Sequence, residues 1–423
     1  MGAPSPRKDV LLVGFGAVGA VYSMILQKSG KVNLTVVARS NHDLVKNEGV
    51  HFKSLKFGEI QGWRPYRVAK SVAAAADRPY SHVFVATKCV PDVIKTSKML
   101  APLLSSPYTE RFPQPTYVLL QNGLNVEKDL YEALSALPHP TPRIISTALY
   151  IMANMLSPNV VQHNDMDKVV MGVYRHKDMT TTTNTPEEQA ALEELADMFV
   201  SGGGTAEIVP EIQRRKYAKN ALNVTFSGIC ALTRYPFTSF FRPPPSEPSH
   251  TYTIYVHPST AQQIQDYSIP VIKGVLDEMV TLGHTLGFTP DSVDGLPATW
   301  AADALEMTRK GQSTPQAAHR PSTMVDIEHG DPIEVEVIWG EVIRLAKERG
   351  VPMPRTETIY GLLLIIQNQI LREREQKAAA PKTEKTSVQA PAAAPTPAAP
   401  TSFMGGLASI SRLISSYLFS TKH

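Results

Sequence analysis

The sequence predicts two domains: an α/β domain with a parallel sheet over residues 1–205, and an all-helical domain over residues 206–375. Three observations support this prediction. Short apolar runs alternate with helical patterns in the first half, a glycine-rich turn follows the first run, and long amphipathic segments take over after about Pro210. A length of 423 residues gives each domain enough chain to bury its own core.

The first half of the chain has the pattern of strands that alternate with helices. Four apolar runs predict strands at Asp9–Val13, Val32–Ala38, His82–Thr87 and Thr116–Gln121. Between the first two runs, Ala20–Lys28 carries apolar residues at helical spacing. Strands that are separated by helices pair in parallel through right-handed crossovers, so the pattern predicts a doubly wound sheet.

The second half has the pattern of helices with one interruption. Amphipathic segments at Ile212–Leu232, Ile264–Leu286 and Glu334–Arg349 show little strand character. Residues 235–260 contain the run FFRPPPSEPSH, which cannot continue a helix because proline lacks the backbone N–H. We therefore expect an exposed loop or insertion there.

The end of the chain, residues 376–423, differs in composition from the rest. Residues 378–400 hold nine Ala and five Pro, which predicts a disordered linker because such a segment has too little apolar bulk to fold. The following run FMGGLASISRLISSYLF predicts a short amphipathic tail helix. Its apolar stripe leaves three docking partners open: the body of the protein, another protein, or a membrane surface.

The distribution of charge argues against nucleic acid as a partner. The net charge is +3, but the segment 376–423 alone carries five basic residues and one acidic residue. The body is therefore close to neutral and lacks the basic footprint of a nucleic-acid-binding domain. The sequence does not determine the oligomeric state and allows a homodimer.

Other residue types limit the compartment and the chemistry. The two cysteines, Cys89 and Cys230, exclude a disulfide-stapled scaffold and indicate small buried side chains, not nucleophiles. The 12 histidines show no metal-ligand spacing, so we expect no metal site. Because no apolar run reaches the roughly 18 residues of a membrane span and the start MGAPSPRKDV lacks a secretory signal, we expect a cytoplasmic protein without a transmembrane segment.

A glycine-rich turn opens the first predicted helix. The run VGFGAVGA has the G-x-G-x-x-G spacing directly after a strand. The first glycine permits a tight turn, the second lets the backbone approach a pyrophosphate, and the third lets the helix pack on the strand. The turn predicts a dinucleotide site of the Rossmann type, formed by Gly14, Phe15, Gly16, Ala17, Val18 and Gly19.

The end of the second predicted strand favours one dinucleotide over the other. NAD enzymes usually carry an acidic residue there for the ribose 2′-hydroxyl, whereas this chain has Arg39, Ser40 and Asn41. A guanidinium pairs well with a 2′-phosphate, so Arg39 favours NADP(H). The alternative is a solvated arginine at a strand end.

Two further strand ends carry polar residues that packing alone does not require. Lys88 follows the third strand, and Gln121 and Asn122 follow the fourth. Because the carboxyl ends of parallel strands face the ligand, we expect Lys88 to reach a phosphate or ribose and Asn122 to hold the nicotinamide side or the substrate.

The first predicted helix of the second domain carries a candidate catalytic group. Lys219, Asn223 and Ser227 are four residues apart and share one face of an ideal helix. An ammonium beside an amide and a hydroxyl can protonate a carbonyl that receives hydride. Neighbouring Arg215 and Lys216 are expected to lower the pKa of Lys219. A solvated basic face is the alternative, and the spacing also allows Lys216 with Asn220.

Several of these motifs occur together and in order, and with them the chain resembles the ketopantoate reductases (2-dehydropantoate 2-reductases). The likeness runs from about Asp9 to about Arg372, with the Pro-rich interruption inside it. Its motifs are VGFGAVGA, VATK, QNG, IQ-x-x-x-Y-x-K-x-x-x-N and PSTMVDIEHGDPIEVEVIWG. The resemblance implies a Rossmann-type domain followed by a helical domain of the 6-phosphogluconate dehydrogenase C-terminal type.

The resemblance also implies an activity, which is the NADPH-dependent reduction of ketopantoate to pantoate in pantothenate and coenzyme A biosynthesis. Lys219 matches the general acid of the family, and it is preferred over Lys216 because the flanking IQ, Tyr217 and ICALT match. The other implied contacts are Asn223 and Ser322 with the substrate, Glu334 and Lys88 with the cofactor, and Asn122 with both.

Two departures from the family pattern bear on the substrate. Ser227 stands where a second asparagine is common, and Tyr217 where tryptophan is common. A hydroxyl holds a substrate differently from an amide, so Ser227 leaves open another small 2-keto acid as substrate. A non-catalytic NADPH-binding regulatory protein is the remaining alternative.

Overall fold

The computed structural model describes residues 6–140 and 142–379, and the predicted tail helix lies outside them. Within the described residues, ten strands form one sheet in the order β4-β3-β9-β8-β7-β6-β1-β2-β5, with β10 paired to β9. The strands are β1 (Lys8–Val13), β2 (Val32–Val37), β3 (Val50–Ser54), β4 (Gly58–Trp63), β5 (Arg67–Ala69), β6 (His82–Val85), β7 (Thr116–Leu119), β8 (Ile144–Ser157), β9 (Val160–Val173) and β10 (Thr205–Ile208).

The centre of the sheet confirms the predicted parallel arrangement. β1 lies between β2 and β6, and β7 follows β6, all in parallel. The helices of this part are α1 (Ala17–Lys28), α2 (His42–Asn47), α3 (Val72–Ala75), α4 (Thr96–Met99), η1 (Ala101–Leu103), α5 (Tyr108–Arg111), α6 (Lys128–Ser135) and α7 (Pro186–Ser201). The strand–helix alternation read from the sequence therefore gives the expected Rossmann-type core.

Alternate residues of the central strands build two separate hydrophobic cores. Val10 and Leu12 of β1 pack with α1 and α7 on one face, where Tyr22 and Phe199 meet edge to face. The opposite face belongs to a core that continues into the helical domain. The side-chain period of two in a strand thus lets one sheet serve both cores.

The strands at the other side of the sheet were not predicted from the sequence, and two pairs of them are antiparallel. β8 and β9 form a long antiparallel hairpin, and β3 pairs antiparallel with β4. The first half of β8 is buried on both faces while its second half is partly exposed, so neither a continuous apolar run nor a clean alternation marks it in the sequence.

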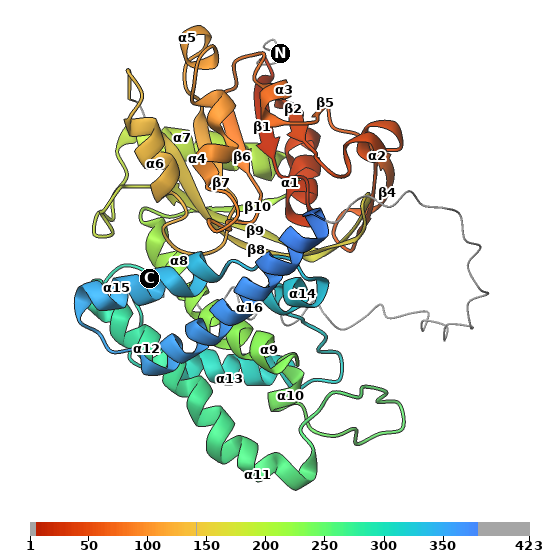
Figure 1. Cartoon of the computed structure of the whole chain (residues 1–423), viewed down its shortest axis with the longest axis vertical. Coiled ribbons are helices and arrows are strands. Elements are labelled where there is room, and N and C mark those ends of the chain that lie inside the picture. The colour runs from red at the N-terminus through yellow and green to blue at the C-terminus, as the bar shows by residue number, and fades with distance from the viewer. Residues whose placement is uncertain (1–5, 141, 380–423) are drawn as a thin grey trace, which may run out of the picture.

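The second part of the chain is helical, as predicted. Its elements are α8 (Ile212–Leu222), η2 (Asn223–Ser227), α9 (Gly228–Thr233), α10 (Thr238–Phe241), η3 (Pro258–Thr260), α11 (Ala261–Gln263), η4 (Ile264–Ser268), α12 (Ile269–Thr285), α13 (Trp300–Gln312), α14 (Ser322–His329), η5 (Glu336–Gly340), α15 (Glu341–Arg349) and α16 (Pro354–Ala379). Figure 1 shows these helices gathered below the sheet, with the long α16 running back up toward it.

The expected exposed loop at residues 235–260 is wrong for its first third. Phe237, Phe240 and Phe241 are buried around α10, and buried Arg242 donates to the carbonyls of Pro315 and Ala317. The chain becomes exposed only from Pro243 onward. Aromatic residues ahead of the prolines therefore anchor the insertion in the core.

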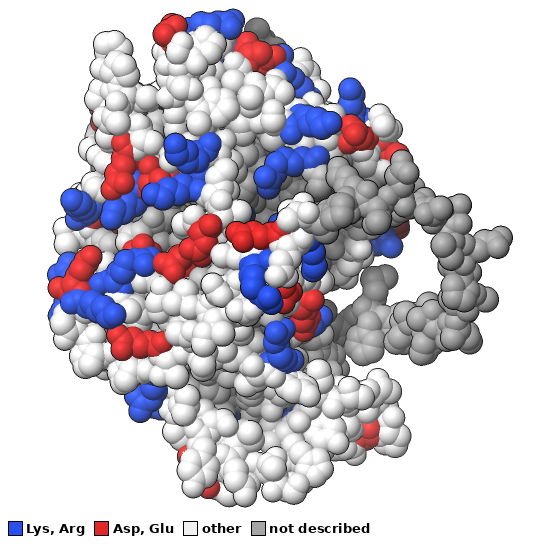
Figure 2. Space-filling view, viewed as in Figure 1, with Lys and Arg blue, Asp and Glu red and all other residues white. Residues whose placement is uncertain are grey.

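The surface agrees with the charge pattern of the sequence. On the face shown in Figure 2, Lys and Arg are interleaved with Asp and Glu. None of the helices within residues 6–379 is long and apolar enough to cross a membrane.

Candidate active site

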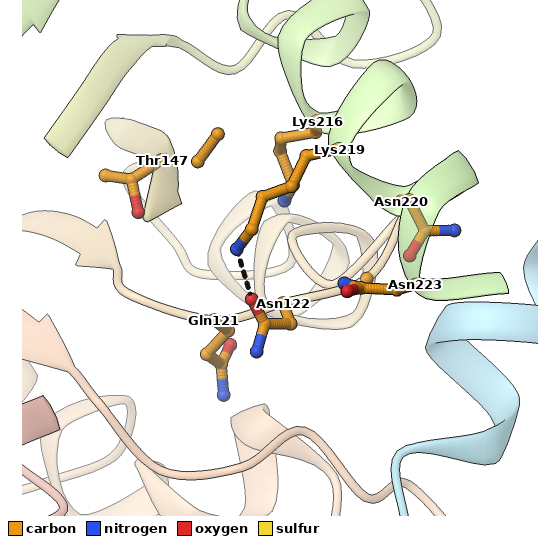
Figure 3. Close-up of a pocket in the computed structure, with 9 residues that line it drawn as sticks. Gln121, Asn122, Thr147, Lys216, Lys219, Asn220 and Asn223 are labelled. Carbon is orange, nitrogen blue, oxygen red and sulfur yellow. Dashed lines mark hydrogen bonds between the residues drawn. The ribbon is translucent and has the colours of Figure 1, made fainter. Parts of the chain in front are cut away.

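A cavity lies where the loop after β7 and the first part of β8 meet helix α8. It is lined by four polar residues of α8 and the start of η2, at helical spacing i, i+3, i+4 and i+7, by three residues of the loop after β7 and by two residues of β8. Figure 3 shows Lys219 and Asn122 pointing toward each other from opposite sides. The lining residues are Gln121, Asn122, Gly123, Thr147, Ala148, Lys216, Lys219, Asn220 and Asn223.

Lys219 reaches across this cavity to Asn122. Its Nζ donates to Asn122 Oδ1 at 2.6 Å and stands 5.7 Å from the ring centroid of Tyr150. Burial lowers the pKa of Lys219 to about 8, helped by the charge of Lys216 and opposed by that of Glu334. The ammonium can therefore release a proton near neutral pH, as a general acid must.

The expected influence of Arg215 on Lys219 is wrong. The Arg215 guanidinium bonds to Glu207 at 2.7 Å and contacts Asp294 at 3.1 Å. It lies on the side of α8 that faces the β9–β10 edge of the sheet, since Glu207 belongs to β10. Of the two predicted neighbours, Lys216 alone contributes to the lowered pKa of Lys219.

Glu334 lies between Lys219 and the loop after β6. Its Oε1 accepts a hydrogen bond from the backbone N–H of Cys89 at 2.9 Å. Burial raises the pKa of Glu334 to about 7, against the lowering effects of that hydrogen bond and of Lys88 and Lys219. The structure therefore brings predicted residues Lys88, Lys219 and Glu334 into one electrostatic neighbourhood.

Lys216, the alternative general acid that the spacing allowed, is engaged in other contacts. Its ammonium forms a buried ion pair with Glu127 and donates to Ser146 Oγ at 3.0 Å. Gln213 Nε2 also donates to the same carboxylate, at 3.2 Å. These contacts direct the Lys216 ammonium at Glu127 and Ser146, so the geometry favours Lys219 as the acid. Glu127 was not predicted, and its place five residues after Asn122 was the one available signal.

The loop after β7 brings Asn122 to the cavity. Gly123 has φ +90°, and a Cβ there would lie 2.6 Å from Val337 Cγ2 of η5. The N–H of Leu124 donates to the carbonyl of Val337 at 2.8 Å. The glycine of the QNG motif thus allows close contact between the two domains, and this contact positions Asn122.

The structure does not bring Ser227 to this cavity. Ser227 is buried and absent from the lining, although Asn223 is present. Residues 223–227 form a π-helical turn, in which one extra residue per turn rotates Ser227 away from the face that a regular helix would give it. The prediction that Ser227 shares a face with Lys219 and Asn223 is therefore wrong.

Ser322 is not among the residues that line the cavity, whereas Lys88 contacts the second domain. Ser322 is the exposed first residue of α14, and Asp326, one turn later, pairs with Lys88. Asp326 was missed, and the motif PSTMVD contained the only signal for it. The pair links the end of β6 to α14 across the domain boundary.

The glycine turn has the form that a dinucleotide requires. Gly14 has φ +102°, and a Cβ there would lie 2.6 Å from the Thr87 nitrogen. A Cβ on Gly19 would lie 2.0 Å from the Gly14 oxygen, whereas a Cβ on Gly16 meets no heavy atom within 4 Å. Gly14 and Gly19 thus serve the fold, and Gly16 leaves room for a ligand.

The N-terminus of α1 is free to receive an anion. Gly16 is its N-cap, and the first turn has no side-chain cap and no acidic residue. Phe15 is buried, while Ala17 and Val18 form the first turn. Asn41 Nδ2 donates to the Phe15 carbonyl at 3.2 Å, which ties the segment after β2 to the glycine turn. Arg39, two residues earlier, is exposed just after the end of β2. These residues fit a dinucleotide phosphate site.

Two family descriptions match this chain: ketopantoate reductase PanE/ApbA over residues 10–176, and ketopantoate reductase PanE/ApbA C terminal over residues 252–367. The chain belongs to the ketopantoate reductase family. This confirms the family resemblance and the two-domain fold class. Family membership places the chain among oxidoreductases that act on CH–OH groups and use a nicotinamide dinucleotide.

Two curated relatives of this ketopantoate reductase family member span nearly the whole chain. An uncharacterized protein of Saccharomyces cerevisiae is 26% identical over 396 residues, covering 89% of this chain and 98% of the yeast protein. The 2-dehydropantoate 2-reductase of Nostoc sp. is 22% identical over 363 residues, covering 84% of this chain and 94% of that protein.

Two solved structures show the same fold as this family member. The 2-dehydropantoate 2-reductase from Methylococcus capsulatus has a TM-score of 0.65 at 20% identity, covering 86% of this chain and 97% of its own. D-mandelate dehydrogenase, in a ternary structure with NADH and anilino(oxo)acetate, has a TM-score of 0.64 at 16% identity, covering 86% and 99%. Within the described residues, no cluster of three or more His, Cys, Asp or Glu is able to hold a metal ion.

Proposed function

We propose that this protein reduces the 2-keto group of 2-dehydropantoate (ketopantoate) to pantoate with NADPH, a step in pantothenate and coenzyme A biosynthesis. The observation that carries the proposal is the Lys219 ammonium in the interdomain cavity, with a pKa lowered to about 8. The nine lining residues include two lysines and four amides but no carboxylate. Such a lining suits a small anionic substrate with a carbonyl to be protonated.

In this proposal each named side chain has one task. Bound NADPH supplies a hydride to the carbonyl carbon. Lys219 gives a proton to the carbonyl oxygen, so that the product is a neutral alcohol and the amine is left to take a proton from solvent. Asn122 holds the Lys219 Nζ in place, as its 2.6 Å hydrogen bond indicates. Asn223 and Ser322 orient the substrate in the near-attack geometry.

The cofactor side is assigned to residues of both domains. The glycine turn from Gly14 to Gly19 holds the pyrophosphate, Arg39 the 2′-phosphate, and Lys88 a ribose or phosphate group. Glu334, which holds the Cys89 backbone, acts on the cofactor side and helps to set the protonation of Lys219. Support comes from the open space at Gly16 and the exposed position of Arg39.

A substrate panel with NADPH tests the reaction. Ketopantoate should give the highest kcat/KM among small branched 2-keto acids. Lys219→Ala should bind NADPH as the unaltered protein does and lose turnover by about 10³-fold or more. Lys273→Ala, at an exposed lysine that pairs with Asp277, serves as the matched control and should keep full activity.

A second candidate function is the reduction of a different small 2-keto acid. Ser227 in place of the common asparagine favours it, and so does the structural similarity to D-mandelate dehydrogenase. A clearly higher kcat/KM for another acid in the panel would select this candidate. NADPH binding without turnover of any keto acid would instead support a regulatory protein and end the enzyme proposal.

A further inference from the structure

Two amide oxygens that line the cavity have no hydrogen-bond donor among the described residues. They are Oδ1 of Asn220 and Oε1 of Gln121, and both atoms are buried. The two residues stand on opposite walls, one on α8 and the other directly after β7. A buried acceptor that lacks a donor is destabilising, so each oxygen indicates a ligand group that is able to donate.

The orientation of each amide is set by chemistry. Asn220 Nδ2 donates to the carbonyl of Ile338 at 2.9 Å, and Gln121 Nε2 donates to the carbonyl of Thr87 at 3.0 Å. A carbonyl oxygen accepts only from a donor, so the NH₂ group must face it and the amide oxygen must face the other way. In Figure 3 the oxygen of Asn220 points toward Asn223 and its nitrogen points away from the drawn group.

The ammonium and hydroxyl groups of the cavity already donate to other partners. Lys219 donates to Asn122, Lys216 to Glu127 and Ser146, and Thr147 Oγ1 to the carbonyl of Leu119. A plain 2-keto carboxylate carries acceptors only, so it has nothing to offer a free amide oxygen. A hydroxylated 2-keto acid carries one O–H donor in addition.

We propose that Asn220 is a specificity residue whose Oδ1 accepts a hydrogen bond from a hydroxyl group of the substrate. Asn220 follows Lys219 directly on α8 and lines the same cavity as Lys219 and Asn223. Gln121 follows β7 on the side where we place the dinucleotide. Its Oε1 would therefore accept a hydrogen bond from a group of the cofactor, not of the substrate. The inference rests on the proposed reduction of a 2-keto acid and restricts its substrate to hydroxylated ones.

The test compares two substrates that differ in one hydroxyl, which are ketopantoate and 3,3-dimethyl-2-oxobutanoate. The unaltered protein should prefer ketopantoate in kcat/KM by about 100-fold or more, because a site built around a hydroxyl rejects an analogue that lacks it. Asn220→Leu should lower kcat/KM for ketopantoate by about 10- to 100-fold more than it lowers kcat/KM for the analogue.

The ratio of the two substrates separates recognition from structural damage. Loss of the bond from Asn220 to Ile338 affects both substrates alike, so it cancels in the ratio. An equal loss for both substrates, or equal efficiency in the unaltered protein, as an ordered water on Oδ1 would give, overturns the inference. This second outcome needs no variant and is decisive even if Asn220→Leu does not fold.

Failure of the proposed function has a different signature. If the unaltered protein reduces neither acid, the reductase proposal falls, and calorimetry with NADP⁺ present then decides the inference. Pantoate should bind at least about tenfold more tightly than 2-hydroxy-3,3-dimethylbutanoate. Equal affinity, or no binding of either, would refute the role of Asn220.

Discussion

At the scale of single residues, the site depends on how burial changes the acidity of two groups. Burial lowers the pKa of Lys219 to about 8 and raises that of Glu334 to about 7. The two shifts have opposite signs because burial disfavours the charged form of a base and of an acid alike. Near neutral pH, both groups are therefore close to the point where they gain or lose a proton.

The acidity of Lys219 predicts the pH dependence of the reaction. The acid must be protonated, so kcat for reduction should fall about tenfold per pH unit above about 8. Glu334→Gln removes a negative neighbour that raises the pKa of Lys219, so the descending limb should move to lower pH. Exposed Glu306→Gln is the control, and its pH profile should stay in place. An unmoved limb in Glu334→Gln would contradict the coupling.

We expect Arg39 to determine the preference for NADPH over NADH. Its side chain is exposed at the end of β2, beside the open glycine turn. Arg39→Ala should raise the Kd of NADPH by about 10- to 100-fold and change that of NADH by less than about twofold, since only NADPH has the 2′-phosphate. Titration of the two cofactors by fluorescence measures this. Equal losses for both would refute the 2′-phosphate assignment.

At the scale of elements, the three glycines of the turn differ in whether the fold or a bound ligand requires them. Gly14 and Gly19 leave no room for a Cβ, whereas Gly16 does. This division agrees with the separate roles that the G-x-G-x-x-G spacing predicts for the three positions. The packing of β1, α1 and the end of β6 adds the contacts that exclude a Cβ at Gly14 and Gly19.

Substitution by alanine should affect stability at Gly14 and dinucleotide affinity at Gly16. Gly14→Ala adds a clash at Thr87 and forces an L-residue to φ +102°, so its thermal midpoint should fall by several degrees. Gly16→Ala should keep its thermal midpoint within about 2 °C and weaken dinucleotide binding by at least about tenfold. Calorimetry with and without NADPH separates the effects. Unchanged affinity in Gly16→Ala would count against a pyrophosphate at this turn.

At the scale of the whole molecule, the site exists because the two domains share contacts at its walls. The buried pair Lys216–Glu127 joins α8 to the residue that caps α6, and Lys88–Asp326 joins β6 to α14. The hydrophobic core on that face of the sheet also continues into the helical domain. The cavity is thus held from both sides.

The buried pair predicts a stability effect. Lys216→Met leaves the Glu127 carboxylate unpaired and should lower the free energy of unfolding by about 3–5 kcal/mol. The double variant Lys216→Met/Glu127→Gln should lose clearly less than the two single variants together, because no buried charge is left alone. Urea denaturation measures both. Additive losses would show that the two side chains act independently.

The sequence alone determined the parallel core, the glycine turn and the helix that bears Lys219, because each depends on spacing within one segment. Family membership followed from the same motifs in order. These features are local, so each can be predicted from the residues of one segment without knowledge of the rest of the chain.

Only the tertiary structure decided which polar groups meet. Lys88 and Asp326 are 238 positions apart, and Glu127 meets Lys216 across 89. The π-helical turn that begins at Asn223 turned Ser227 away from the cavity. Asn220, which the sequence offered only as an alternative partner of Lys216, became part of the cavity wall. Long-range packing and a change of helical pitch depend on many weak contacts between distant segments. They therefore cannot be predicted from any one segment of the sequence.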